Sequence, residues 1–236
     1  MSVKPQPDRL YGRQKGKNLR PRQHWLLDVF LPRLAWPEVP FGITPRETWL
    51  EVGFGGGEHA FELAGKSPDI GYIAAEVFET GICSLLSKLA PEHVENPVPP
   101  PNLRLFAEDA RPLLRCLADG ELSKLFLMFP DPWPKARHAK RRFVHPEMVE
   151  EAARVLRQGG EWRIASDDPT YQAWTDEVLG AQAYFAITRH TTRPEGWPPT
   201  RYEAKAIAAG RAPVYWSLVL RGADRRAVCF WFSFWL

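Results

Sequence analysis

From Thr48 onward, short apolar runs alternate regularly with segments whose apolar residues recur at helical spacing. This alternation constrains the fold more than any other feature of the sequence, because successive strand–helix units build a parallel sheet with helices on both faces. The apolar runs predict buried strands over Thr48–Val52, Tyr72–Ala75, Leu103–Ala107, Leu125–Phe129 and Trp162–Ala165. The intervening and following segments predict helices over Glu58–Lys66, Thr80–Leu89, Arg111–Ala118, Pro146–Arg157 and Tyr171–Leu179. The pattern therefore favours a doubly wound, Rossmann-like α/β fold.

Segments on either side of the alternation complete the expected fold. His24–Leu34 has apolar residues at helical spacing and predicts a helix ahead of the first strand. Gly159-Gly160 is expected to end the helix that begins at Pro146. After the alternation, Tyr184–Arg189 and Val214–Leu220 have strand character and are joined by a polar loop. We expect them to form a terminal antiparallel hairpin, giving a mostly parallel sheet of seven strands. Such a hairpin distinguishes the methyltransferase version of this fold from the dinucleotide-binding version.

Length and charge predict the domain organisation. A chain of 236 residues suits one large α/β domain. The net charge is only +3, but residues 1–23 include seven Lys or Arg against a single acid. A basic arm of this kind either contacts a polyanion, because each neutralised phosphate releases counterions, or is a solvated tail. We therefore expect a flexible basic arm over 1–23, one domain over 24–221 and an apolar tail over 222–236.

Cysteine usage and the chain ends bear on where the protein works. Cys83, Cys116 and Cys229 are far apart and form no C-x-x-C pair, which argues against a metal site or a disulfide framework and fits a reducing interior. The N-terminus lacks the apolar core of a signal peptide. The apolar stretch Ala227–Leu236 is shorter than the roughly 20 residues that span a bilayer, and we assign it no function. We expect a cytoplasmic protein without membrane or metal partners, either a monomer or a homodimer.

A glycine-rich turn follows the first predicted strand, in Leu50-Glu-Val-Gly-Phe-Gly-Gly-Gly57. Glycines such as Gly53 and Gly55 let the backbone turn sharply and approach a ligand closely. A dinucleotide site would have a third glycine where this chain has Glu58, and a carboxylate there repels a pyrophosphate. A sulfonium cofactor carries no phosphate, so this acid and Glu51 suit it better. Glycine-rich turns also occur as plain tight connections.

Two further acids follow the next two predicted strands. Glu76 lies about 20 residues beyond the glycines, where a carboxylate can bind both hydroxyls of a ribose. Asp109 follows the third strand and is placed to accept from an adenine amino group, although an acid there could equally cap a helix. Ligands of open α/β sheets collect at the edge formed by the carboxyl ends of the strands. The acids therefore favour a cofactor that carries a nucleoside.

The loop after the fourth predicted strand, Phe129-Pro-Asp-Pro-Trp-Pro-Lys135, is the most informative segment. Its three prolines stiffen it, and a stiff loop keeps a site preorganised. Asp131 would be presented to a substrate, and Trp133 offers a flat face on which a base can stack. The run Lys135–Arg142 adds five cations and no acid. A base-stacking loop followed by phosphate-binding cations favours a nucleic-acid substrate over a rigid structural turn with a solvated charged face.

The stretch Phe129-Pro-Asp-Pro-Trp-Pro-Lys-Ala-Arg-His-Ala-Lys-Arg-Arg142 resembles the signature of bacterial tRNA (guanine-N7-)-methyltransferases, the TrmB type. Leu50-Glu-Val-Gly-Phe-Gly55 is similar to the cofactor loop of that family, and Thr200-Arg-Tyr-Glu203 to its T-x-x-E element. The likeness runs from about Gly12 to Arg221 in the expected order, and the long signature is highly specific. It implies a class I methyltransferase fold and transfer of a methyl group from S-adenosylmethionine to N7 of a guanine in the variable loop of tRNA.

The resemblance also implies roles for individual residues. The cofactor would be bound by Glu51, Gly53, Gly55, Glu76, Asp109 and Asp131. Asp131 would also be the catalytic acid. The substrate guanosine would be held by Lys135, Asp167, Thr200, Arg201, Tyr202 and Glu203. The RNA backbone would be gripped by Arg137, Lys140, Arg141 and Arg142, and tRNA is the expected partner.

This chain departs from the family pattern at two places, and other functions compete with the resemblance. Asp168 stands where the family commonly has an aromatic residue, and the residues after Gly222 match nothing in the family. A nicotinamide-dependent dehydrogenase would share the ribose-binding acid but leaves the basic loop unexplained. A non-catalytic RNA-binding module would bind RNA without the cofactor. Methylation of another base or of protein is a third alternative, since amino-group methyltransferases also place an acid or amide before a proline.

Overall fold

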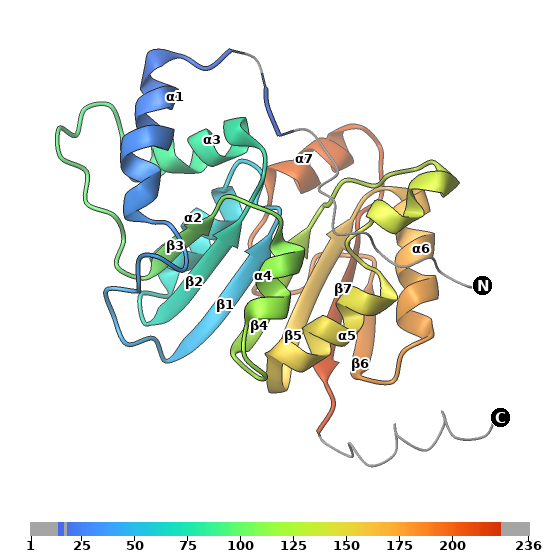
Figure 1. Cartoon of the computed structure of the whole chain (residues 1–236). Coiled ribbons are helices and arrows are strands. Elements are labelled where there is room, and N and C mark those ends of the chain that lie inside the picture. The colour runs from blue at the N-terminus through green and yellow to red at the C-terminus, as the bar shows by residue number, and fades with distance from the viewer. Residues whose placement is uncertain (1–13, 17, 223–236) are drawn as a thin grey trace.

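A sheet of seven strands, with order β3-β2-β1-β4-β5-β7-β6, forms the centre of the molecule (Figure 1). The structure is a computed structural model that describes residues 14–16 and 18–222. The strands are β1 (Glu47–Val52), β2 (Ile70–Ala75), β3 (Leu103–Phe106), β4 (Leu122–Met128), β5 (Leu156–Ser166), β6 (Phe185–His190) and β7 (Val214–Leu220). The first five are parallel, and β7 lies antiparallel between β5 and β6. The predicted fold class, with its terminal antiparallel hairpin, is confirmed.

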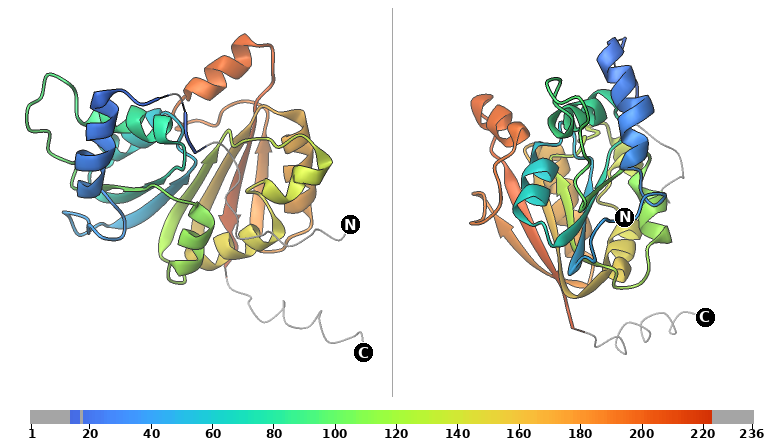
Figure 2. Two further views of the ribbon diagram at one scale, coloured as in Figure 1. Left: turned by 45° about the horizontal axis from the view of Figure 1, so that its top comes forward. Right: turned by 90° about the vertical axis from the view of Figure 1, so that its left-hand side faces the viewer.

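Helices pack on both faces of this sheet. The helical elements are α1 (Pro21–Trp25), η1 (Leu26–Phe30), η2 (Leu31–Arg33), α2 (Glu58–Lys66), α3 (Glu79–Leu89), α4 (Ala110–Cys116), η3 (Ala136–Arg141), α5 (Pro146–Val155), α6 (Pro169–Gly180) and α7 (Arg201–Ala208). The segment from α1 to η1 joins α2 and α3 in one apolar cluster, whereas α4, α5 and α6 contribute to another. Helix α7 lies beyond the carboxyl ends of the parallel strands, apart from both layers (Figures 1 and 2).

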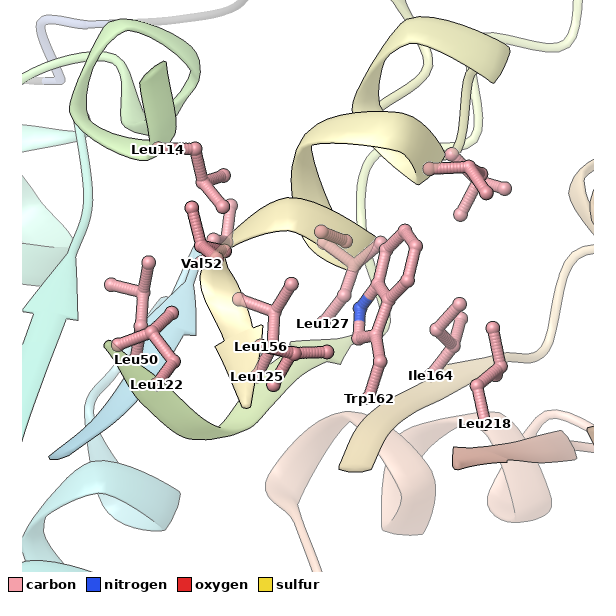
Figure 3. Packing of buried hydrophobic residues seen from close by; sticks show 14 of the residues in the cluster. Leu50, Val52, Leu114, Leu122, Leu125, Leu127, Leu156, Trp162, Ile164 and Leu218 are labelled. Carbon is pink, nitrogen blue, oxygen red and sulfur yellow. The ribbon is translucent and has the colours of Figure 1, made fainter. Parts of the chain in front are cut away.

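The larger apolar cluster contains the strand residues whose apolar runs predicted burial. Leu50, Leu125 and Trp162 come from three neighbouring strands and are all fully buried (Figure 3). Trp162 packs edge-on against Phe143 and Phe185, with ring centroids 6.5 and 6.2 Å away. Burying a large apolar side chain contributes about 1.5–3 kcal/mol, so this layer is a major source of the stability that holds the site in place.

The prediction that Gly159-Gly160 ends helix α5 is wrong. Helix α5 ends at Val155, and Leu156 is already extended and begins β5. Leu122 pairs with Leu156 and Lys124 pairs with Glu161, so β5 bulges between these two pairs. Gly159 lies in that bulge with φ +72°, a backbone conformation that glycine adopts without steric cost. Gly159 therefore allows the bulge in β5 and does not cap a helix.

The predicted polar loop before β7 is also wrong, because it contains α7. The side chain of Thr200 accepts a hydrogen bond from the backbone N–H of Glu203 at 3.0 Å, and Glu203 accepts from the N–H of Thr200 at 3.4 Å. This reciprocal pair is a capping box, which starts a helix by satisfying its first free N–H groups. The T-x-x-E element is therefore the N-terminus of a helix.

The N-terminal helical segment begins at Pro21, three residues before the expected His24, and continues through a π turn and a 3₁₀ turn to Arg33. Residues 1–13 of the basic arm and the apolar stretch Ala227–Leu236 lie outside the described residues. The boundaries of the predicted arm, domain and tail stay predictions. In the part of the chain that the structure describes, no helix is long and apolar enough to cross a membrane.

Candidate active site

The glycine turn between β1 and α2 forms the floor of the candidate site. Gly53 and Gly55 have φ +71° and +57°, so both need the freedom of glycine. A Cβ added at Gly53 would meet nothing within 4 Å, which means that open space lies beside this residue. The turn is therefore shaped by its backbone and leaves room at Gly53 for a ligand.

Glu76 follows β2 and is tied to the glycine turn. Its Oε2 accepts from the backbone N–H of Gly55 at 2.8 Å, and its Oε1 accepts from the N–H groups of Val77 and Phe78 at 2.8 and 3.0 Å. Burial raises the pKa of Glu76, the three N–H groups oppose that shift, and the neighbouring charge of Asp131 adds to it. The carboxylate is thus fixed in orientation at the edge of the sheet.

A cavity of about 130 Å³ opens between the tips of the first three parallel strands. Its lining includes Gly53, Glu76, Glu108, Asp109, Arg141 and Phe143. Carboxylates, an aromatic ring and the backbone of a glycine turn are the groups that recognise a nucleoside. The cavity is smaller than a usual ligand site of roughly 300–1,000 Å³, so it accounts for one part of such a ligand.

Asp109 lines this cavity and also caps a helix. Its Oδ1 accepts from the backbone N–H of Arg111 at 3.0 Å, and its Oδ2 pairs with the Arg111 guanidinium at 2.5 Å. The capping role that the sequence allowed is therefore present. A hydrogen bond to an adenine amino group stays a prediction.

Glu51 lies beneath the glycine turn and is not among the residues that line the cavity. It is 1% exposed, accepts from the Tyr72 hydroxyl at 2.7 Å and lies 3.1 Å from Nδ1 of His59. Burial first, and then the charge of Glu51, raise the pKa of Tyr72 well above its ordinary value. His59 is in the first turn of α2, so Glu51 connects the end of β1 to that helix.

The loop after β4 presents Asp131 to solvent. Phe129 and Trp133, on either side of it, have φ +55° and +45°. Such a conformation costs a residue other than glycine about 1–3 kcal/mol, and it persists only where the surroundings impose it. Asp131 itself is exposed, and its charge acts on Glu76. The structure thus brings these two predicted site residues to the same edge of the sheet.

The 3₁₀ helix η3 takes up residues Ala136–Arg141 of the basic run after this loop, and the cations of the run differ in exposure. Lys135 and Arg137 are exposed, and Lys140 is half-buried. The Arg141 guanidinium lies 4.9 Å above the Trp133 ring. Arg142 is 4% exposed and donates to the carbonyls of Pro132 and Trp133 in the loop Phe129–Lys135. In this conformation its guanidinium therefore points into the protein. RNA contacts by the run stay predictions.

All but one of the predicted guanosine-binding residues come from the C-terminal part of the chain, after β5; the exception is Lys135. Asp167 follows β5 and accepts from Arg211 Nε at 2.5 Å. Glu203 is 6% exposed, and its Oε1 accepts from the Tyr215 hydroxyl at 2.5 Å and from Arg193 Nε at 3.0 Å. Burial first, and then this hydrogen bond, raise the pKa of Tyr215.

Two further residues of this group lie at the start of α7. The Tyr202 ring packs against Gly55, and the Arg201 guanidinium lies 5.5 Å above the Tyr202 ring. Helix α7 is therefore in contact with the glycine turn. The partners Arg193, Arg211 and Tyr215 were not found from the sequence, because nothing near them in the chain marks them as neighbours of Asp167 or Glu203.

Comparisons with known proteins identify the family of the chain. Residues 45–215 match the Methyltransf_4 family, described as "Putative methyltransferase". The chain is 61% identical to a tRNA (guanine-N(7)-)-methyltransferase of Granulibacter bethesdensis, over 94% of this chain and 99% of the relative. It is 48% identical to the protein of that name from Paramagnetospirillum magneticum, over 88% of this chain and 90% of the relative.

Solved structures share the fold at low sequence identity. The 16S rRNA methyltransferase KamB aligns with a TM-score of 0.55 and 16% identity, over 75% of this chain and 89% of that chain. A SAM-dependent O-methyltransferase from Thermotoga maritima aligns with a TM-score of 0.51 and 14% identity, over 87% and 73%. These likenesses show a class I methyltransferase fold. With the family match and the identity to its relatives, they establish that the chain belongs to the tRNA (guanine-N7-)-methyltransferases of the TrmB family.

Proposed function

We propose that this protein transfers a methyl group from S-adenosylmethionine to N7 of a guanine in tRNA. The observation that carries the proposal is the meeting of Gly53, Glu76 and Asp109 at one cavity, beside the loop that presents Asp131. The names of the relatives support the substrate, and the SAM-dependent O-methyltransferase that shares the fold supports the cofactor.

The residues at the cavity fit the proposed cofactor. Glu76 is oriented by three backbone N–H groups, and an Oε2 that accepts one of them keeps a lone pair for a ribose hydroxyl. Asp109 would accept from the adenine amino group, and the open space beside Gly53 would admit the nucleoside. Glu51, beneath the turn, would hold the first turn of α2 in place through His59. When bound, the cofactor supplies a methyl group on a positively charged sulfur.

Guanine N7 has an in-plane lone pair and no proton, so the reaction needs no general base. What the protein must do is align the base and exclude water, and alignment of this kind can lower a barrier by several kcal/mol. Positive charge develops on the purine ring as the methyl group arrives. Asp131, exposed at the tip of a stiff loop, would hydrogen-bond the guanine and stabilise that charge.

The Watson–Crick edge of the guanine carries N–H donors and needs an acceptor. Asp167 suits this role better than Glu203, because Glu203 is nearly buried and its Oε1 already accepts from Tyr215 and Arg193. Asp167 is paired with Arg211, whose half-exposed side chain can move aside. Lys135, Thr200, Arg201 and Tyr202 would surround the nucleoside, while Arg137, Lys140 and Arg141 of η3 would meet the RNA backbone.

Two other functions receive less support. A dehydrogenase on this sheet needs a phosphate site at the start of α2, where Glu58 stands. A non-catalytic RNA-binding module has no need of the oriented Glu76 carboxylate or of the cavity beside it.

The proposal is tested with an unmodified tRNA transcript and labelled S-adenosylmethionine, followed by mapping of the labelled nucleotide. We expect one methyl group on N7 of one guanine in the variable loop. A matched transcript made with 7-deazaguanosine lacks the N7 lone pair and should accept no label. Label on another base, or equal label in the 7-deaza transcript, would refute the proposal.

A further inference from the structure

Arg142 is the most buried cation of the basic run, and its guanidinium donates hydrogen bonds to the loop Phe129–Lys135. Its Nε donates to the carbonyl of Pro132 at 3.1 Å, and its Nη2 donates to the carbonyl of Trp133 at 3.0 Å. Only 4% of the residue is exposed, whereas Arg137, five positions earlier, is exposed. One planar guanidinium therefore binds the two carbonyls that follow Asp131.

The composition of the loop explains why it needs such a donor. Pro130, Pro132 and Pro134 have no backbone N–H, so the loop has few donors with which to satisfy its own carbonyls. The positive φ of Trp133 adds a conformational cost that other contacts must offset. An arginine fork can bind two neighbouring carbonyls at fixed angles, which a lysine ammonium cannot do.

The other side of the guanidinium faces helix α6. It lies 5.0 Å from the centre of the Trp174 ring, and Trp174 Nε1 donates to the carbonyl of Val144 at 2.5 Å. The Tyr171 hydroxyl accepts from the N–H of Val144 at 3.2 Å. Arg142 thus lies between the loop and a helix that begins directly after Asp167 and Asp168.

We propose that Arg142 is a positioning residue for the proposed methyl transfer, and that it does not contact RNA phosphate. Its guanidinium binds the carbonyls of Pro132 and Trp133 and packs against the Trp174 ring of α6. These contacts fix the loop that carries Asp131 relative to α6. The inference rests on the proposed function, because it assigns Arg142 to the chemical step of that reaction.

Arg142→Gln and Arg137→Gln form a matched pair that removes one cation each from the same run. If the exposed Arg137 binds a phosphate, its substitution should weaken tRNA binding and reduce the slope of log K against log salt by about one. We expect Arg142→Gln to lower kcat at least tenfold, while the tRNA dissociation constant and its salt slope stay within about twofold of the wild type. Binding is measured by fluorescence anisotropy at several salt concentrations.

Arg142→Lys keeps the positive charge but removes the planar guanidinium, so it distinguishes a role of the charge from a role of the hydrogen-bond geometry. An interaction with phosphate tolerates lysine, whereas the fork to two carbonyls does not, so kcat should stay low in this variant. Trp174→Leu removes the ring beneath the guanidinium and leaves Arg142 in place, so it provides a second test if the Arg142 variants do not fold. It should lower kcat without changing the salt slope. Cofactor calorimetry and thermal unfolding check that each variant is folded.

The outcomes separate this inference from the proposed function. If the wild type methylates guanine N7 and Arg142→Gln keeps its kcat but binds tRNA more weakly with a reduced salt slope, Arg142 is a phosphate ligand and the inference is wrong. Full activity of Arg142→Lys with wild-type kcat would overturn it as well. If the wild type does not methylate tRNA, the proposed function itself fails.

Discussion

Tyr202 packs against Gly55, so the C-terminal part of the chain is in contact with the turn that follows the first strand. A Cβ added at Gly55 would lie 2.9 Å from Cε2 and 3.0 Å from the hydroxyl oxygen of Tyr202. Real Cβ atoms almost never approach a neighbour as closely as 2.9 Å. The glycine is therefore required both for its positive φ and for the approach of α7.

Gly55→Ala should weaken cofactor binding and stability together. The left-handed backbone costs an alanine about 1–3 kcal/mol, and the new methyl group displaces Tyr202. Gly65→Ala is the control, because an added Cβ there meets nothing within 4 Å and a helical alanine gains about 0.5–1 kcal/mol. Urea unfolding and cofactor calorimetry measure both effects. Equal stability of the two variants would contradict the structural account.

Asp131→Ala should lower methyl transfer by roughly 100-fold or more, because it removes the carboxylate proposed to stabilise charge on the guanine. Its tRNA affinity should stay nearly unchanged, since the basic run is intact. Asp119→Ala is the control, because Asp119 is an exposed acid whose side chain pairs with Arg154 away from the cavity. Single-turnover rates with labelled cofactor give the comparison. A fully active Asp131→Ala enzyme would show that the assigned role is wrong.

Cofactor affinity should fall as the pH is lowered through the pKa of Glu76. Burial raises that pKa, so protonation begins at a higher pH than for an ordinary carboxyl group. The ionised form accepts from backbone N–H groups and from ribose, so affinity is fully present above the raised pKa and disappears below it. Asp131→Asn removes a charge that contributes to the shift and should move the midpoint to lower pH. Calorimetry at a series of pH values checks both profiles, and a midpoint at or below the ordinary carboxyl value would oppose the assignment.

Cys83 should resist alkylation at neutral pH. It is 1% exposed, and burial raises the pKa of its thiol to about 11. Because only the thiolate reacts, about one thiol in 1,000 is reactive at pH 8. Cys116 is exposed and serves as the internal reference. Peptide mass mapping after a timed iodoacetamide treatment should show Cys116 modified before Cys83, and equal rates at Cys83 and Cys116 would indicate that α3 does not pack as described.

The sequence predicted the sheet well because its strands are short apolar runs between clear turns. The bounds predicted for the helix Glu58–Lys66 agree with the structure, since glycines precede it and polar residues follow it. Helix α7 was missed because only Glu203 and Ala206 are buried in it, so no series of large apolar core residues marks it in the sequence. The spacing of Thr200 and Glu203 was a capping signal that could have revealed it.

The candidate site was predicted in part. Acids after successive strands lie at one edge because parallel strands end together, so Glu76 and Asp109 could be placed from their positions in the sequence. Charge patterns, however, do not show which cation of a run points inward. Arg142 and Arg137 have the same side chain and belong to the same basic run, yet of the two Arg142 donates to the loop carbonyls and Arg137 is exposed. That difference depends on tertiary packing against α6.

The place of β7 in the sheet bears on how the chain folds as it leaves the ribosome. Among the described residues β7 is the last strand in sequence, yet it lies between β5 and β6, so β6 and one edge of β5 take their hydrogen-bonding partners from it. Until Val214–Leu220 has been translated, β5 is an edge strand with unpaired backbone groups, which are prone to pair with other chains. That edge of β5 therefore stays open to other chains while the residues between Ser166 and Val214 are being synthesised.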